Sequence, residues 1–234
     1  RMVEKDAIAL SVIPALVSAI ASESRESIHA AALAAVERFD AAELESTLRG
    51  AAMRLGMDEM LDGVIGPLLL TIGSRWDAGL LSPAHEHLAT AVVRRTLTWM
   101  MENGTPPSMA PAIVVATLAG QTHELGAMLV AAAASSHGWR VVYLGANLPA
   151  RDIAVAANHT RATAVALSLL HPTEDPTIAG ALRDLRAALP ASTAIIAGGT
   201  AAASYAPALA AVGASQFGSI REWRAWLRGA TKTR

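Results

Sequence analysis

The sequence has 234 residues, of which 53% are hydrophobic and 17% charged, enough for one large domain or two small ones. Nineteen Lys+Arg against 20 Asp+Glu give a formal net charge of −1, so the chain as a whole shows no basic surface for nucleic acid. The absence of Cys excludes disulfides and Fe–S clusters, and no apolar run reaches the roughly 18 residues of a membrane span. We expect a cytoplasmic protein without a membrane segment.

The first hundred residues predict an antiparallel four-helix bundle. Asp40 is placed to cap the second helix, Gly56 to end it, and Pro83 to stand in the first turn of the fourth. Apolar residues recur at helical spacing between these signals, which places the helices at residues 24–39, 40–56, 57–76 and 83–101. Residues 1–23 are a linker or an extra helix, and the helical bundle is expected to span 24–104.

A different pattern begins after Asn103–Pro107, the strongest boundary signal in the chain. Short β-rich runs stand at Ala112–Thr117, Arg140–Leu144, Thr163–Ser168, Thr193–Ala197 and Ala214–Gly218. Helical stretches alternate with them at 123–137, 150–159, 176–188, 200–211 and 220–229. This alternation predicts an α/β domain over 108–234, with a doubly wound, five-stranded parallel sheet of the flavodoxin-like (Rossmann-like) order 2-1-3-4-5.

Ligands of such sheets bind at the carboxyl ends of the strands, so the loops there are the place to search. Neither GxGxxG nor GxxxxGK[ST] follows the first strand, which argues against nicotinamide and P-loop nucleotides. These loops contain the imidazole of His123 and the hydroxyl of Ser168. They also contain two adjacent glycines, Gly198 and Gly199, which have no side chains. A histidine can ligate a metal, and two glycines let a flat group approach the backbone.

The spacing of these pieces is distinctive. The segment Gln121-Thr122-His123-Glu124-Leu125-Gly126 is followed by 41 residues, then Ser168-Leu169-Leu170, then 27 residues, then Gly198-Gly199. This pattern resembles the cobalamin-binding domains of the methionine synthase type, which carry Asp-x-His-x-x-Gly, Ser-x-Leu and Gly-Gly at these spacings. The resemblance implies that His123 is the lower cobalt ligand, in place of the cofactor's own base.

By the same resemblance, the displaced nucleotide tail runs past Ser168, Leu170, Gly198 and Gly199, and the segment from Gln121 to Gly126 contacts the cofactor. The sequence departs from the family at Gln121, where most relatives have an aspartate that accepts the second N–H of the ligand histidine. Gln121 accepts that hydrogen bond only as a neutral amide, so ligation should be weaker. The remaining histidines at 29, 137, 159 and 171 are interpreted as surface or helix-end residues.

A second motif, in the predicted helical bundle, indicates which kind of cobalamin-binding protein the sequence resembles. Trp76 is followed, after nine residues, by Glu86-His87. A Trp-x9-Glu-His signature before a cobalamin-binding domain resembles the CarH-type light-dependent transcriptional regulators. It implies that Trp76, Glu86 and His87 line a pocket over the upper face of adenosylcobalamin. The family's MerR-like winged-helix domain has no counterpart in the sequence, and Asp77 stands where relatives often place a histidine.

Two functions follow from these resemblances. The first is an adenosylcobalamin-binding light sensor that regulates transcription, in which photolysis of the Co–C bond changes domain arrangement and then self-association or binding of a partner regulator. The alternative is a corrinoid carrier protein of a methyltransferase system, which needs an open upper face. In neither is the chain an enzyme with catalytic residues of its own, and as given it would not bind DNA directly.

Overall fold

The computed structural model describes residues 24–103, 106–107 and 109–232. Contacts divide the chain into two compact units, residues 1–96 and 97–234, and the division falls within helix α5, Pro83–Glu102. The predicted linker or extra helix over 1–23 lies outside the described residues, as do 104, 105 and 108 at the predicted domain boundary. Among the described helices, none is both long and apolar enough to cross a membrane.

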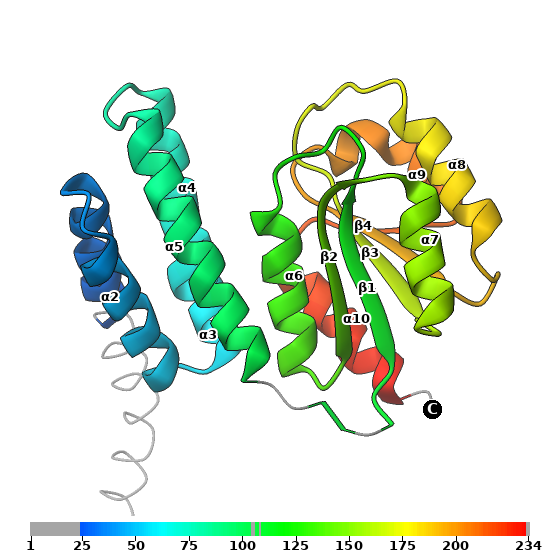
Figure 1. The fold of residues 1–234 in the computed structure, drawn as a ribbon, viewed down its shortest axis with the longest axis horizontal. Helices are drawn as coiled ribbons and strands as arrows, with labels where there is room; N and C mark the ends of the chain where they lie inside the picture. Colours follow the sequence, from blue (N-terminus) through cyan, green and yellow to red (C-terminus); the bar gives the residue numbers. More distant parts are fainter. Residues whose placement is uncertain (1–23, 104–105, 108, 233–234) are drawn as a thin grey trace, which may run out of the picture. The chain divides into compact units, whose positions relative to one another are not determined.

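The first unit is helical, as predicted. Residues 24–37 are helical, and α2 (Ala41–Arg54), α3 (Met57–Met60), α4 (Gly66–Asp77) and α5 follow. The Asp40 side chain accepts a hydrogen bond of 2.9 Å from the backbone N–H of Glu43, which confirms the predicted cap of α2. Helices α4 and α5 run in opposite directions and are joined by the short turn 78–82 (Figure 1).

The predicted helix over 57–76 contains an irregularity. Between α3 and α4 the backbone forms a π-helical segment, η1 (Leu61–Ile65), in which the N–H of Gly66 bonds to the carbonyl of Leu61. The segment is followed by Gly66 and then by Pro67, which has no N–H to donate to the preceding turn. The helix thus continues from 57 to 77, one residue beyond Trp76.

The second unit is the predicted parallel sheet with interleaved helices (Figure 1). Its strands pair in the order β2-β1-β3-β4-β5, which confirms the flavodoxin-like order. The strands are β1 (Ala112–Leu118), β2 (Arg140–Leu148), β3 (Ala164–Ser168), β4 (Ala194–Gly198) and β5 (Ser215–Phe217). The helices are α6 (Leu125–Ser136), α7 (Ala150–His159), α8 (Ile178–Ala188), η2 (Ala202–Tyr205), α9 (Ala206–Ala211) and α10 (Ile220–Lys232).

Alternating residues of β1 face two different layers. Val114 and Ala116 belong to a core that α7, α8 and α9 cover, with Ile153 and Leu182 among its members. On the other face lie α6 and α10 (Figure 1). Because both faces are covered, β1 is buried along its whole length, as expected for a central strand of a doubly wound sheet.

Three of the boundaries that differ from the sequence prediction have a visible cause or bear on the site. Strand β2 extends to Leu148 rather than ending at Leu144, because the Asn147 N–H bonds to Thr117 Oγ1 at 2.9 Å and so keeps the end of β2 attached to β1. Helix α6 begins at Leu125, which leaves His123 and Glu124 in the preceding loop. The stretch 200–211 is a 3-10 turn followed by α9, since Pro207 lacks the N–H that a continuous helix requires.

We predict that Gly199→Ala destabilises the chain more than Gly213→Ala. Both glycines have positive φ, +102° and +68°, so both substitutions strain the backbone by about 1–2 kcal/mol. A Cβ at Gly199 would also overlap the carbonyl oxygen of Leu169, whereas a Cβ at Gly213 would meet nothing within 4 Å. Urea unfolding followed by circular dichroism should separate the variants, and equal losses of unfolding free energy would contradict this account.

Candidate functional site

The loops that leave β1, β3 and β4 meet at the carboxyl edge of the sheet. A Cβ at Gly126 would lie 2.7 Å from Ser168 Oγ, so the glycine lets helix α6 approach the end of β3. The Leu169 N–H bonds to the carbonyl of Gly198 at 2.8 Å, and Gly199 packs against Leu169. The structure thus brings together the three pieces of the motif that lie far apart in sequence.

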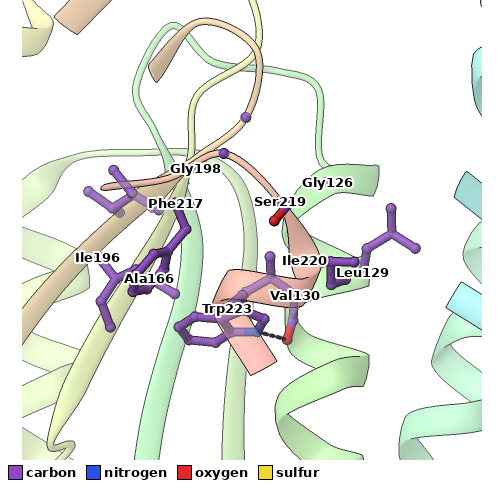
Figure 2. Close-up of a pocket in the computed structure, with 14 residues that line it drawn as sticks. Gly126, Leu129, Val130, Ala166, Ile196, Gly198, Phe217, Ser219, Ile220 and Trp223 are labelled. Carbon is purple, nitrogen blue, oxygen red and sulfur yellow. Dashed lines mark hydrogen bonds between the residues drawn. The ribbon is translucent and has the colours of Figure 1, made fainter. Parts of the chain in front are cut away.

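Behind this edge is an apolar cavity of about 160 Å³ between β3, β4 and helices α6 and α10 (Figure 2). An apolar cavity of about 150 Å³ can hold an aromatic ring. Trp223 forms one wall and is held in place by a hydrogen bond of 3.1 Å from its Nε1 to the carbonyl of Val130 (Figure 2). The other lining residues include Gly126, Leu129, Ala166, Ile196, Gly198, Gly199, Phe217 and Ile220.

Ser168 ends β3 next to this cavity and is 4% exposed. Its hydroxyl makes no hydrogen bond to another described residue. The Ser168 Oγ lies beside Gly126, which lines the cavity.

His123 lies in the loop between β1 and α6 and is exposed. Neither nitrogen of its imidazole is hydrogen-bonded within the part of the chain that the structure describes. Its ring meets the ring of His171 edge to face, with centroids 5.8 Å apart and an interplanar angle of 87°. An exposed imidazole with both nitrogens free is suited to metal ligation.

Gln121 makes different contacts from those expected. It is 1% exposed, its Oε1 accepts from the Leu170 N–H at 3.0 Å, and its Nε2 donates to the Pro172 carbonyl at 3.1 Å. Both polar ends of the amide thus bind the loop after β3, and the expected hydrogen bond between Gln121 and His123 is not formed among the described residues.

The rest of the motif segment lies on the same loop. Thr122 is exposed, and Leu125 begins α6. Glu124 is turned toward β2, where its Oε2 accepts a hydrogen bond of 2.8 Å from the Tyr143 hydroxyl. The Glu124 carboxylate thus binds β2 through Tyr143.

The loop between β3 and α8 carries residues that sequence reasoning missed. The Tyr205 hydroxyl donates to the Pro172 carbonyl at 2.9 Å and accepts from the Asp175 N–H at 2.8 Å. Hydrogen bonds from the Thr177 hydroxyl and then its backbone N–H lower the pKa of Asp175. His171, interpreted from sequence as a surface residue, stands in this loop beside His123; its place three residues after Ser168 was the available signal.

In the helical unit, Trp76 is the penultimate residue of α4, and Glu86 and His87 belong to the start of α5. The short turn 78–82 places all three at the same end of this helix pair. The Trp76 side chain is 48% exposed. Glu86 accepts a hydrogen bond of 2.6 Å from Thr90 Oγ1, and its other oxygen lies 3.5 Å from His87 Nε2.

His85 has a separate role. Its Nδ1 lies 3.1 Å from the Ser82 backbone nitrogen and 2.8 Å from Ser82 Oγ, and its ring packs on Phe39 with centroids 3.9 Å apart. His85 therefore stabilises the turn before α5, and its contacts are with Ser82 and Phe39 and not with His87. Among the described residues no group of three His, Asp or Glu side chains is arranged to hold a metal ion by itself.

Two family models match the chain, and both are described as a B12 binding domain. One matches residues 28–99, which lie mainly in the helical unit, and the other matches residues 111–220 of the α/β unit. The second match contains the motif segment, Ser168 and the paired glycines. Both units therefore have B12-binding relatives.

Two relatives match over most of the chain. It is 29% identical to the HTH-type transcriptional repressor CarH of Myxococcus xanthus over 191 residues, which are 82% of this chain and 64% of CarH. It is 31% identical to the HTH-type transcriptional repressor CarA of the same organism over 181 residues, 77% of this chain and 60% of CarA. The chain thus spans less than two thirds of the length of either repressor.

The fold has a close counterpart among solved structures. The monomethylamine corrinoid protein of Methanosarcina barkeri superposes with a TM-score of 0.64 at 15% identity, covering 91% of this chain and 97% of that one. At this identity the likeness concerns the fold. The two domain matches show a helical B12 binding domain followed by an α/β one, and the repressor matches show a distant relation to CarH and CarA. The chain therefore belongs to the cobalamin-binding proteins.

Proposed function

We propose that this chain is the light-sensing module of an adenosylcobalamin-dependent regulator of transcription. The observation that carries the proposal is the similarity to two transcriptional repressors over both units, together with the Trp76, Glu86 and His87 signature of CarH-type regulators. The output would be a change in self-association or in the binding of a partner regulator.

The α/β unit has features that fit the cofactor. His123 is exposed with free ring nitrogens and would hold the cobalt from below. The adjoining cavity is apolar and would take the ring of the displaced nucleotide tail, and Ser168 lies beside Gly126 at the edge of that cavity. Gly198 and Gly199 present backbone without side chains to the tail, and Leu170 packs beside Gly126.

The helical unit would supply the light-dependent contacts. When bound, adenosylcobalamin supplies a cobalt–carbon bond that visible light breaks. Trp76 offers a half-exposed indole on which an adenine can stack, and Glu86 and His87 offer polar atoms at the same end of the helix pair. Because these contacts exist only while the adenosyl group is present, its loss shifts the equilibrium between arrangements of the protein.

We predict that His123→Ala removes the protein nitrogen from the cobalt. In the Co(II) form, electron paramagnetic resonance of the wild type should show coupling to one nitrogen, and the variant should lack it and retain cobalamin more weakly. His159→Ala, an exposed histidine at the end of α7, is the matched control and should behave like wild type. Unchanged nitrogen coupling in His123→Ala would mean that another group ligates the metal.

We predict that the chain binds adenosylcobalamin more tightly than methylcobalamin in the dark, and that Trp76→Ala weakens this preference. An aromatic stack contributes about 0.5–1.5 kcal/mol beyond area burial, so the preference should fall roughly two- to tenfold. Leu70→Ala, at a 75% exposed apolar residue of the same helix, is the control and should leave the preference intact.

The whole proposal is tested with protein loaded with adenosylcobalamin in the dark and then illuminated with green light. We expect the absorbance spectrum to change together with the molar mass measured by light scattering, or with the capture of a partner regulator. Equal dark affinity for the adenosyl and methyl forms, with no change of assembly on illumination, would instead support the corrinoid carrier.

A further inference from the structure

The backbone on both sides of His171 is fixed by one side chain. The Oε1 of Gln121 accepts from the N–H of Leu170, and its Nε2 donates to the carbonyl of Pro172. These two residues are the immediate neighbours of His171 in the chain. Gln121 is buried, so its amide holds the loop of His171 against the loop of His123 without competition from water.

The two imidazoles meet at this junction. Their centroids are 5.8 Å apart and the ring planes are nearly perpendicular, so the edge of one ring faces the other. Both side chains are exposed, and in the described structure neither ring has a hydrogen-bond partner. A rotation of either ring about its side-chain bonds can therefore bring two nitrogens into contact without breaking an existing bond.

A histidine that ligates a metal through one nitrogen carries an N–H on the other, and that N–H is normally bonded to an acceptor that orients the ring. Of the side chains that flank His123, Gln121 Oε1 already accepts from the Leu170 N–H, Glu124 Oε2 accepts from the Tyr143 hydroxyl on β2, and Thr122 is exposed. His171 is the side chain whose ring the structure places against the His123 ring, and its nitrogens make no hydrogen bond to the described residues.

We propose that His171 is the hydrogen-bond partner of His123 when His123 ligates cobalt, and that Gln121 positions His171 for this role. The proposal rests on the proposed function of His123 as the lower ligand. A neutral imidazole of His171 accepts the N–H of the ligand ring, so it orients His123 without adding the negative charge that an aspartate would bring. His171 is a positioning residue in this arrangement.

The amide at position 121 is required by this geometry. A carboxylate there could accept from the Leu170 N–H but could not donate to the Pro172 carbonyl, since an ionised carboxylate is an acceptor only. An amide satisfies both groups at once, and the Tyr205 hydroxyl occupies the second lone pair of the Pro172 carbonyl. Gln121, which stands where the family has an aspartate, and His171 are therefore coupled through the loop that the Gln121 amide holds.

The test uses the full chain loaded with cobalamin and reduced to Co(II). Added imidazole labelled with ¹⁵N competes with His123, and electron paramagnetic resonance distinguishes the doublet of the label from the triplet of the protein's ¹⁴N. Loss of an outer partner typically weakens ligation by about 10- to 100-fold. We therefore expect His171→Ala to lower the imidazole concentration for half displacement at least tenfold, while cobalamin stays bound.

Two further variants separate orientation from general damage to the loop. His171→Gln restores an acceptor oxygen and should recover most of the resistance to imidazole, and His159→Ala should match wild type. If His171→Ala is displaced at the wild-type concentration while His123→Ala has lost nitrogen coupling, His123 is the ligand and the role of His171 is refuted. If His123→Ala keeps its coupling and loses it only when His171 is also replaced, His171 is itself the ligand and both assignments fail.

Discussion

Strands β1 and β3 are neighbours in the sheet, and the chain leaves them toward opposite faces. After β1 the chain enters α6 on one face, and after β3 it enters α8 on the other. Two loops that diverge from neighbouring strands open a crevice at their carboxyl ends. They would also leave backbone N–H and carbonyl groups unpaired there. The buried amide of Gln121 spans the divergence and pairs two of those groups, and the positions of His123 and His171 both depend on it.

The α/β domain was largely predictable because its signals are local. Each strand is a short β-rich run bounded by turn residues, and the parallel order follows from the regular alternation with helices. Parallel strands place all their carboxyl ends on one edge, so the positions of His123, Ser168 and the two glycines after their strands predicted that they lie at the same edge of the sheet. Their close approach has a simple basis, since Gly126 and Gly199 occupy positions where a Cβ would collide with β3 or its exit loop.

Features that depend on a choice between hydrogen-bond partners were not predictable. A glutamine amide beside a histidine can bind that histidine or a nearby backbone, and only the three-dimensional path of the loop after β3 decides between them. The extension of β2 has the same cause: Asn147 reads as a turn residue, yet the Asn147 side chain accepts from the Gly120 N–H at 2.9 Å and its own N–H bonds to Thr117. In the helical unit, the π segment before Pro67 changes the rotational setting of every later residue of that helix, Trp76 included.

The wall of the cavity has an optical consequence. Trp223 stacks on Trp226 with centroids 5.4 Å apart and planes 9° apart, and Trp226 stacks on Trp139 at 5.5 Å, so three of the chain's five tryptophans form one column. Because Trp223 also lines the cavity, a ring that enters it alters the environment of the whole column. A ring that enters the cavity would therefore change the surroundings of Trp223, and intrinsic tryptophan fluorescence is the label-free signal in which to look for that change.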